Sequence, residues 1–118
     1  MNIMNTQENR PWGTYTVLLD DDKCKVKKIV IRSGQAPSYQ YHFKRNEYWI
    51  IIKGKGTLKL DDVERELKEG DSIFIPKLSK HQFKNTGDTD IEFIEIQTGE
   101  YFGEDDIVRL QDNYGRVS

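Results

Sequence analysis

The 118-residue chain contains one cysteine, two histidines and three prolines. A single cysteine, Cys24, cannot form a disulfide within the chain, which favours a reducing compartment. No apolar run approaches the roughly 20 residues that a membrane-spanning helix needs. The polar start of the chain also lacks the apolar stretch of a secretory signal peptide. We therefore expect a soluble, cytoplasmic protein with no membrane partner.

The sequence also lacks a strong excess of either charge. Eighteen basic and twenty acidic residues give a net charge of −2, whereas binding to a phosphate backbone needs a basic surface, so we expect no nucleic-acid partner. Basic and acidic residues do cluster in one place. We interpret this cluster as a solvated hairpin of balanced charge, in preference to a binding site for a small anion. It comprises Asp20, Asp21, Asp22, Lys23, Lys25, Lys27 and Lys28.

Short β-prone segments follow one another along the chain, and its length suits one domain. Turn residues such as Gly34, Gly70 and Gly87 separate segments rich in β-branched and aromatic residues. Many short strands predict an all-β sandwich or barrel. Acidic residues leading into Ile107 predict one short C-terminal helix, over residues 104–110. The predicted strands are Tyr15–Leu19, Lys25–Ile31, Tyr48–Lys53, Thr57–Leu60, Ser72–Ile75, Gln82–Lys84 and Ile91–Gln97.

Both histidines fall within spaced motifs. The first motif runs Gly-x5-Gln40-x-His42-x4-Glu47-x6-Gly, and the second runs Gly-x5-Pro-x4-His81-x3-Asn. Gln40 and His42 are two residues apart, so on a strand they point to the same face. Two imidazoles, one carboxylate and one amide oxygen form a mixed N/O set suited to Mn, Fe, Co, Ni or Zn. We expect one divalent ion bound by Gln40, His42, Glu47 and His81.

The two motifs resemble the two stretches that define the cupins, except that Gln40 replaces a histidine and Leu78 a glycine. The resemblance implies a double-stranded β-helix, or jelly-roll barrel, with the short C-terminal helix. It places the cupin domain at residues 10–118, after a flexible N-terminus at residues 1–9. It also implies a homodimer.

Further segments narrow the resemblance. They look like those of the type II mannose-6-phosphate isomerase domain, found at the C-terminus of bifunctional isomerase/mannose-1-phosphate guanylyltransferases. The likeness implies a metal-dependent aldose–ketose isomerase of carbohydrate metabolism that interconverts mannose 6-phosphate and fructose 6-phosphate through an enediolate. It implies a catalytic role for Arg109, with Arg45 as a second candidate for the sugar phosphate. The segments are Arg10–Gly13, Ser38–His42, Arg45–Trp49, Ile94–Gly99 and Gly103–Arg116.

Two features weaken the assignment of this reaction. Phe43 and Tyr48 replace residues that are commonly histidine in the family, and no imidazole outside the ligand set remains as a general base. Arg109 could instead pair with Asp105 or Asp112 on the surface. A sugar-binding or regulatory cupin and a non-haem iron oxygenase therefore stay open as alternatives.

Overall fold

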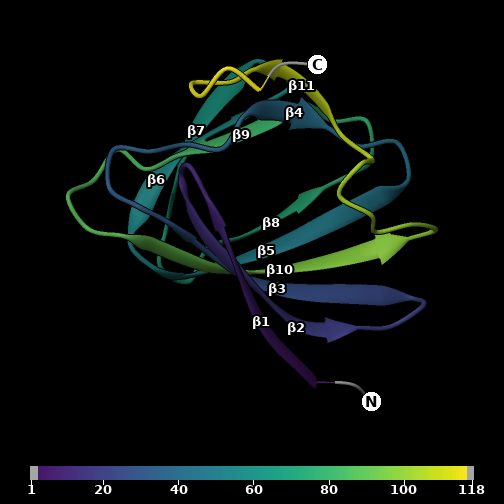
Figure 1. Cartoon of the computed structure of the whole chain (residues 1–118). Coiled ribbons are helices and arrows are strands. Elements are labelled where there is room, and N and C mark those ends of the chain that lie inside the picture. Colours follow the sequence, from purple (N-terminus) through teal and green to yellow (C-terminus); the bar gives the residue numbers. More distant parts are fainter. Residues whose placement is uncertain (1–2, 117–118) are drawn as a thin grey trace.

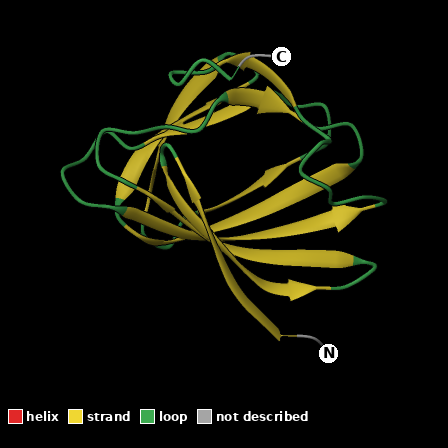
Figure 2. Cartoon of the chain, in the orientation of Figure 1, coloured by secondary structure: helices red, strands yellow, loops and turns green. Residues whose placement is uncertain are grey.

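Two antiparallel sheets face each other around a shared core in the computed structural model, which describes residues 3–116 (Figure 1). No helix occurs among these residues, so the fold consists of strands and loops (Figure 2). The strands are β1 (Ile3–Arg10), β2 (Gly13–Asp20), β3 (Cys24–Ile31), β4 (Tyr39–Tyr41), β5 (Arg45–Lys53), β6 (Lys55–Leu60), β7 (Val63–Lys68), β8 (Ser72–Ile75), β9 (His81–Lys84), β10 (Ile91–Gly99) and β11 (Val108–Gln111).

The strand order identifies the architecture. One sheet has six strands in the order β1-β2-β3-β10-β5-β8, and the other has five in the order β11-β4-β9-β6-β7. Strand β10 pairs along its length with both β3 and β5, so it joins the early strands to the middle of the chain. This confirms the predicted all-β, double-stranded β-helix.

The core lies between the inner faces of the two sheets. Alternate residues of the long strands point inward, as the period of two in a β-strand requires. Trp49 packs against Phe93 with the rings tilted by 40° and their centroids 4.8 Å apart, and Phe83 meets Phe93 edge-on at 5.6 Å. This aromatic cluster fills the barrel on one side of the polar residues described below.

The predicted C-terminal helix is wrong. Residues 104–106 form a turn, and the chain then continues as β11, which pairs with β4. Seven residues gain little from helix formation alone, whereas β11 gains backbone hydrogen bonds from a neighbouring strand. Asp106, expected to favour a helix start, instead accepts hydrogen bonds from backbone N–H groups of the loop after β4.

At the other end of the chain, residues 3–10 form β1 and pair with β2. The predicted boundary between a flexible segment and the cupin domain at residue 10 stays a prediction. Residues 1, 2, 117 and 118 lie outside the described part of the chain. Within that part, no helix is long and apolar enough to cross a membrane.

Candidate metal centre

Three adjacent strands place polar residues on the buried face at the same end of the barrel. Along β10 the inward-facing side chain is apolar at Phe93 and acidic at Glu95. Along β5 it is likewise apolar at Trp49 and acidic at Glu47. The antiparallel registers bring these polar positions together, since Glu95 lies opposite residue 27 and Glu47 opposite residue 97. One end of the interior is therefore apolar and the other is a buried polar site, formed by Lys27, Arg45, Glu47, Glu95 and Gln97.

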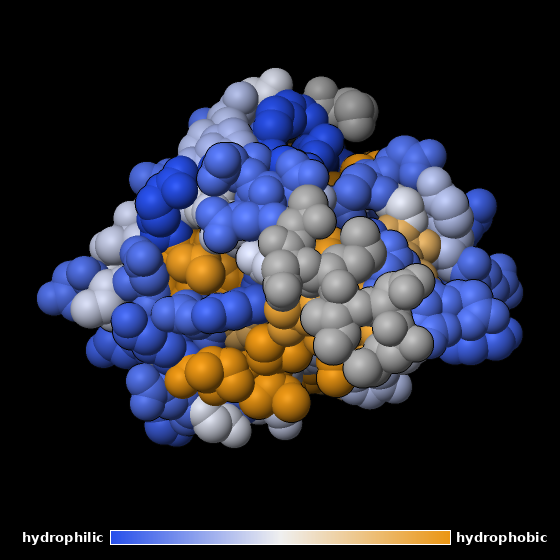
Figure 3. Space-filling model, turned by 60° about the horizontal axis from the view of Figure 1, so that its bottom comes forward, coloured by the Kyte–Doolittle hydropathy of each residue, from blue (hydrophilic) through white to orange (hydrophobic). Residues whose placement is uncertain are grey.

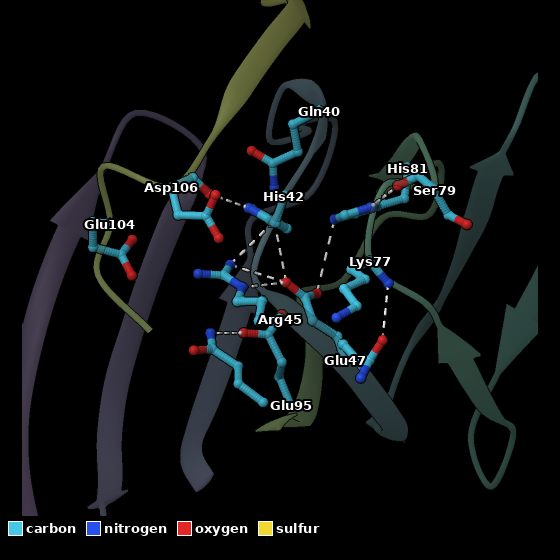
Figure 4. A network of polar contacts seen from close by, with 12 residues as sticks. Gln40, His42, Arg45, Glu47, Lys77, Ser79, His81, Glu95, Glu104 and Asp106 are labelled. Atoms are coloured by element: carbon cyan, nitrogen blue, oxygen red, sulfur yellow. Dashed lines mark hydrogen bonds and ion pairs between the residues drawn. The ribbon is translucent and has the colours of Figure 1, made fainter. Parts of the chain in front are cut away.

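Both histidines join Glu47 at this polar end (Figure 4). His42 follows the end of β4, His81 begins β9, and Glu47 projects from β5. His42 Nε2 lies 3.2 Å from one Glu47 carboxylate oxygen, and His81 Nε2 lies 3.8 Å from the other. One ligand atom from each residue lies within 4.8 Å of the other two, and all three side chains are buried.

The hydrogen bonds of the two imidazoles hold them in the tautomer that a metal ligand needs. His42 Nδ1 lies 2.6 Å from the backbone oxygen of Asp106, and His81 Nδ1 lies 3.0 Å from that of Ser79. A carbonyl oxygen only accepts, so each Nδ1 carries the proton and each Nε2 presents a lone pair. His81 Nε2 is buried and has no hydrogen-bond partner within the described structure, as expected of an atom whose partner is a metal.

The electrostatics of the cluster favour the protonation states that ligands need. Burial lowers the pKa of His81 below its usual range, against the opposing charge of Glu47. Burial alone would raise the pKa of Glu47, but the charge of Arg45 and the contacts with His42 and His81 outweigh it and hold the pKa well below its usual range. A neutral His81 imidazole and an ionised Glu47 carboxylate therefore coexist, and together with His42 they fit a divalent ion.

Gln40, the fourth predicted ligand, lies near the cluster but has no contact with the His42, Glu47 or His81 side chains among the hydrogen bonds of residues 3–116. Gln40 lines a pocket together with both histidines, and it pairs across the sheet with His81. Figure 4 shows it above His42, whereas Glu47 lies below. Its Oε1 accepts a hydrogen bond from Ser38 Oγ at 3.0 Å. Coordination by Gln40 stays a prediction.

The two predicted arginines occupy different places. Arg45 is buried beside the cluster, where its Nε donates to Glu47 at 2.9 Å and its Nη2 lies 3.1 Å from His42 Nε2. Arg109 lines the pocket from β11, and its Nε is buried without a hydrogen-bond partner in residues 3–116. Asp112 pairs with Arg116 instead. The catalytic roles of both arginines stay predictions.

Two residues beside the site, Lys27 and Glu95, were missed or placed on the surface by sequence reasoning. Lys27 belongs to the hairpin expected to be solvated, yet it is buried, with its ammonium 2.6 Å from Glu104 and 4.3 Å from the centroid of the Tyr15 ring. Burial, reinforced by the charge of Glu47, raises the pKa of Glu95 to about 8. The alternation of Ile91, Phe93 and Glu95 could have identified that buried acid.

The fold and the cluster define the class of this protein: it is a cupin with a buried site of two histidines and one carboxylate. Solved structures agree on the fold. KdgF from Halomonas sp. superposes with a TM-score of 0.78 at 13% identity, covering 89% of this chain and 97% of that one. A double-stranded β-helix protein from Klebsiella pneumoniae gives 0.76 at 17% identity, with 89% and 90% covered.

More specifically, the chain belongs to the family described as mannose-6-phosphate isomerase C-terminal, which it matches over residues 2–112. A mannose-1-phosphate guanylyltransferase of Sinorhizobium fredii is 43% identical over 87% of this chain and 20% of its own length. The alginate biosynthesis protein AlgA of Pseudomonas aeruginosa is 41% identical over 92% of this chain and 23% of its own length. The chain thus spans about a fifth to a quarter of these curated relatives.

These relatives overturn the reaction predicted from the sequence. The prediction of a mannose-6-phosphate isomerase is wrong, because relatives covering nearly the whole chain are named for guanylyl transfer to mannose 1-phosphate. The site agrees with this correction, since both imidazoles belong to the ligand cluster and neither remains as a free base. The alternatives considered from the sequence fit these names no better.

Proposed function

We propose that this chain is a metal-binding, sugar-phosphate-binding domain that serves a mannose-1-phosphate guanylyltransferase. The observation that carries the proposal is the buried cluster of His42, Glu47 and His81. Its two histidines line a pocket that arginines also line. The three residues would hold the ion, with Gln40 as the predicted fourth ligand. When bound, the ion supplies a Lewis acid that attracts hydroxyl or phosphate oxygens.

The arginines of the pocket favour an anionic sugar. Arg10 and Arg109 line the same pocket as the cluster, and the Nε of Arg109 still has a hydrogen bond to donate. Arg45 instead forms an ion pair with Glu47. A guanidinium presents a planar fork that matches a phosphate group. We therefore assign the phosphate to Arg109 and the sugar hydroxyls to the metal end.

Calorimetric titration of the metal-loaded protein tests the proposal. Mannose 1-phosphate should bind, unphosphorylated mannose should bind at least tenfold more weakly, and removal of the metal should weaken both. Arg109→Ala should weaken the phosphorylated sugar while leaving metal content unchanged, whereas exposed Arg65→Ala should change nothing. Equal affinity for the two sugars would contradict the assignment of the phosphate to Arg109.

The proposal assigns the sugar phosphate, and not the nucleotide, to this domain. Nucleotide phosphates are commonly bound at a glycine-rich turn before a helix, and residues 3–116 contain no helix. GTP should therefore give no heat of binding under conditions in which mannose 1-phosphate does. Tight GTP binding by the isolated chain would show that the two roles are not divided in this way.

We also propose a homodimer, formed through the outer face of the six-stranded sheet. Apolar side chains continue across four neighbouring strands on that face, where Figure 3 shows a hydrophobic patch. Four of them are 42–54% exposed and leave on the order of 400 Å² of apolar surface. The sheet-face patch comprises Tyr48, Ile50, Ile52 and Phe74, flanked by Val26, Ile94 and Ile96.

We propose that a second copy of this chain binds to the sheet-face patch. A stable dimer buries about 800 Å² per partner, which the exposed side chains with their half-buried neighbours can approach. Lys28 and Glu92 at its border already pair with each other at 3.0 Å, so two such faces can stack without leaving a charge unpaired. Ile50→Lys should give a monomer in sedimentation analysis, whereas Val63→Lys on β7 should leave the dimer intact. A monomeric wild-type protein at high micromolar concentration would refute this interface.

A further inference from the structure

The loop between β10 and β11 crosses from the six-stranded sheet to the five-stranded sheet beside the metal centre. We call residues 100–107 the strap. Its first residue is fixed by a backbone hydrogen bond from Glu100 N to Lys44 O at 3.1 Å. Its middle is fixed by the ion pair between Glu104 and buried Lys27 at 2.6 Å. The strap is therefore attached to both β3 and the turn that follows β4.

Its most buried residue, Asp106, makes three contacts with the segment that carries His42. One carboxylate oxygen accepts a hydrogen bond from Phe43 N and the other accepts one from Lys44 N, each at 3.0 Å. The backbone oxygen of the same residue accepts from His42 Nδ1 at 2.6 Å. The side chain thus holds the backbone after His42. The main chain holds the ring of His42 itself, as Figure 4 shows.

We infer that Asp106 is a positioning residue for the metal centre: its carboxylate holds its own backbone oxygen where that oxygen keeps the proton of His42 on Nδ1. Nε2 is then left unprotonated, and its lone pair, which faces Arg45 Nη2 in this structure, can bind a metal. The inference rests on the proposed metal site. A neutral imidazole has one N–H, and loss of the acceptor at Nδ1 lets the proton move to Nε2. An Nε2–H group cannot coordinate an ion. Mutation of a group that hydrogen-bonds to a metal ligand commonly changes metal affinity 10–100-fold.

The other histidine provides an internal comparison. His81 Nδ1 is held by the backbone oxygen of Ser79, two residues away on its own loop. Within residues 3–116, no hydrogen bond joins the strap to His81 or Ser79. A change in Asp106 should therefore alter the tautomer of His42 and leave that of His81 unchanged, whereas a general loosening of the barrel would affect both.

Two measurements on the full chain test the inference. In the metal-free wild type, long-range proton–nitrogen NMR spectra should show both histidines with the proton on Nδ1. Asp106→Ala and the isosteric Asp106→Asn should increase the Nε2–H form of His42 only, and should weaken Co²⁺ binding 10–100-fold. Asp105→Asn is the matched control, because Asp105 is exposed and contacts Tyr101 instead of the histidine segment; it should change neither measurement.

The outcomes separate this inference from the proposed function. A wild-type protein that binds no Co²⁺ would refute the metal site itself. Wild-type binding with unchanged affinity in folded Asp106 variants would refute the role of Asp106 alone. If both variants fail to fold by circular dichroism, the wild-type spectrum still decides, because an Nε2–H tautomer at His42 would overturn the inference.

Discussion

Glu95 makes the stability of the metal-free protein depend on pH in a direction opposite to that of most carboxylates. Its side chain is buried on β10, where it accepts a hydrogen bond from Gln97 Nε2 at 2.7 Å. Burial and the neighbouring charge of Glu47 raise its pKa from 4.5 to about 8. In the unfolded chain the same group ionises near pH 4.5, so the native state holds its proton over a range in which the unfolded state has lost it.

The sign and the size of the effect follow from proton linkage. The native state keeps the full contribution of the protonated acid below pH 4.5 and loses it as the pH rises toward about 8. Each pH unit in this range costs about 1.4 kcal/mol, so the loss by pH 7 is on the order of 3 kcal/mol. Glu95→Gln removes the ionisation while keeping the shape of the protonated acid, and should recover most of this free energy.

Urea unfolding with a chelator present, at pH 5, 6, 7 and 8, measures the effect. The free energies of unfolding of wild type and Glu95→Gln should be similar at pH 5 and should diverge to about 3 kcal/mol at pH 7. The exposed Glu64→Gln should follow the wild type at every pH. A difference between wild type and Glu95→Gln that does not grow with pH would show that Glu95 is ionised in the native protein, and would refute the reasoning.

Three further changes test the site and the barrel. His81→Ala should weaken Co²⁺ binding by at least 100-fold and abolish the rise in melting temperature that added metal gives the wild type, in a thermal scan. Ile51→Ala should cost about 2–5 kcal/mol in urea unfolding, because its side chain is 1% exposed in the core, while Ile52→Ala on the outer face should cost under about 1 kcal/mol. Gly99→Ala should destabilise the start of the strap, because an added Cβ would lie 2.3 Å from Lys44 O at a φ of +141°; unchanged amide exchange at residues 100–107 would contradict it.

The sequence alone determined the all-β class and the three residues that meet at the candidate metal centre. Strand alternation is a local property, so segments such as Ser72–Ile75 could be recognised without knowing their partners. Ligand spacing is also local within each motif, and two motifs in the right order sufficed to predict that His42, Glu47 and His81 act together. The reaction was mispredicted because a resemblance confined to one domain does not determine which activity the larger relatives perform.

Only the tertiary structure decided what surrounds those ligands. Lys27 looks like one of several surface lysines in the sequence, and its burial depends on which face of β3 the partner strands cover. Asp106 looks like a helix-starting acid, but the distant turn after β4 offers it two backbone N–H groups, and that pairing favours a strap and a strand over a short helix. Long-range hydrogen bonds of this kind join residues that no local pattern connects. The sequence could therefore predict the candidate ligands, while the groups that orient them and set their charge became visible only in the closed barrel.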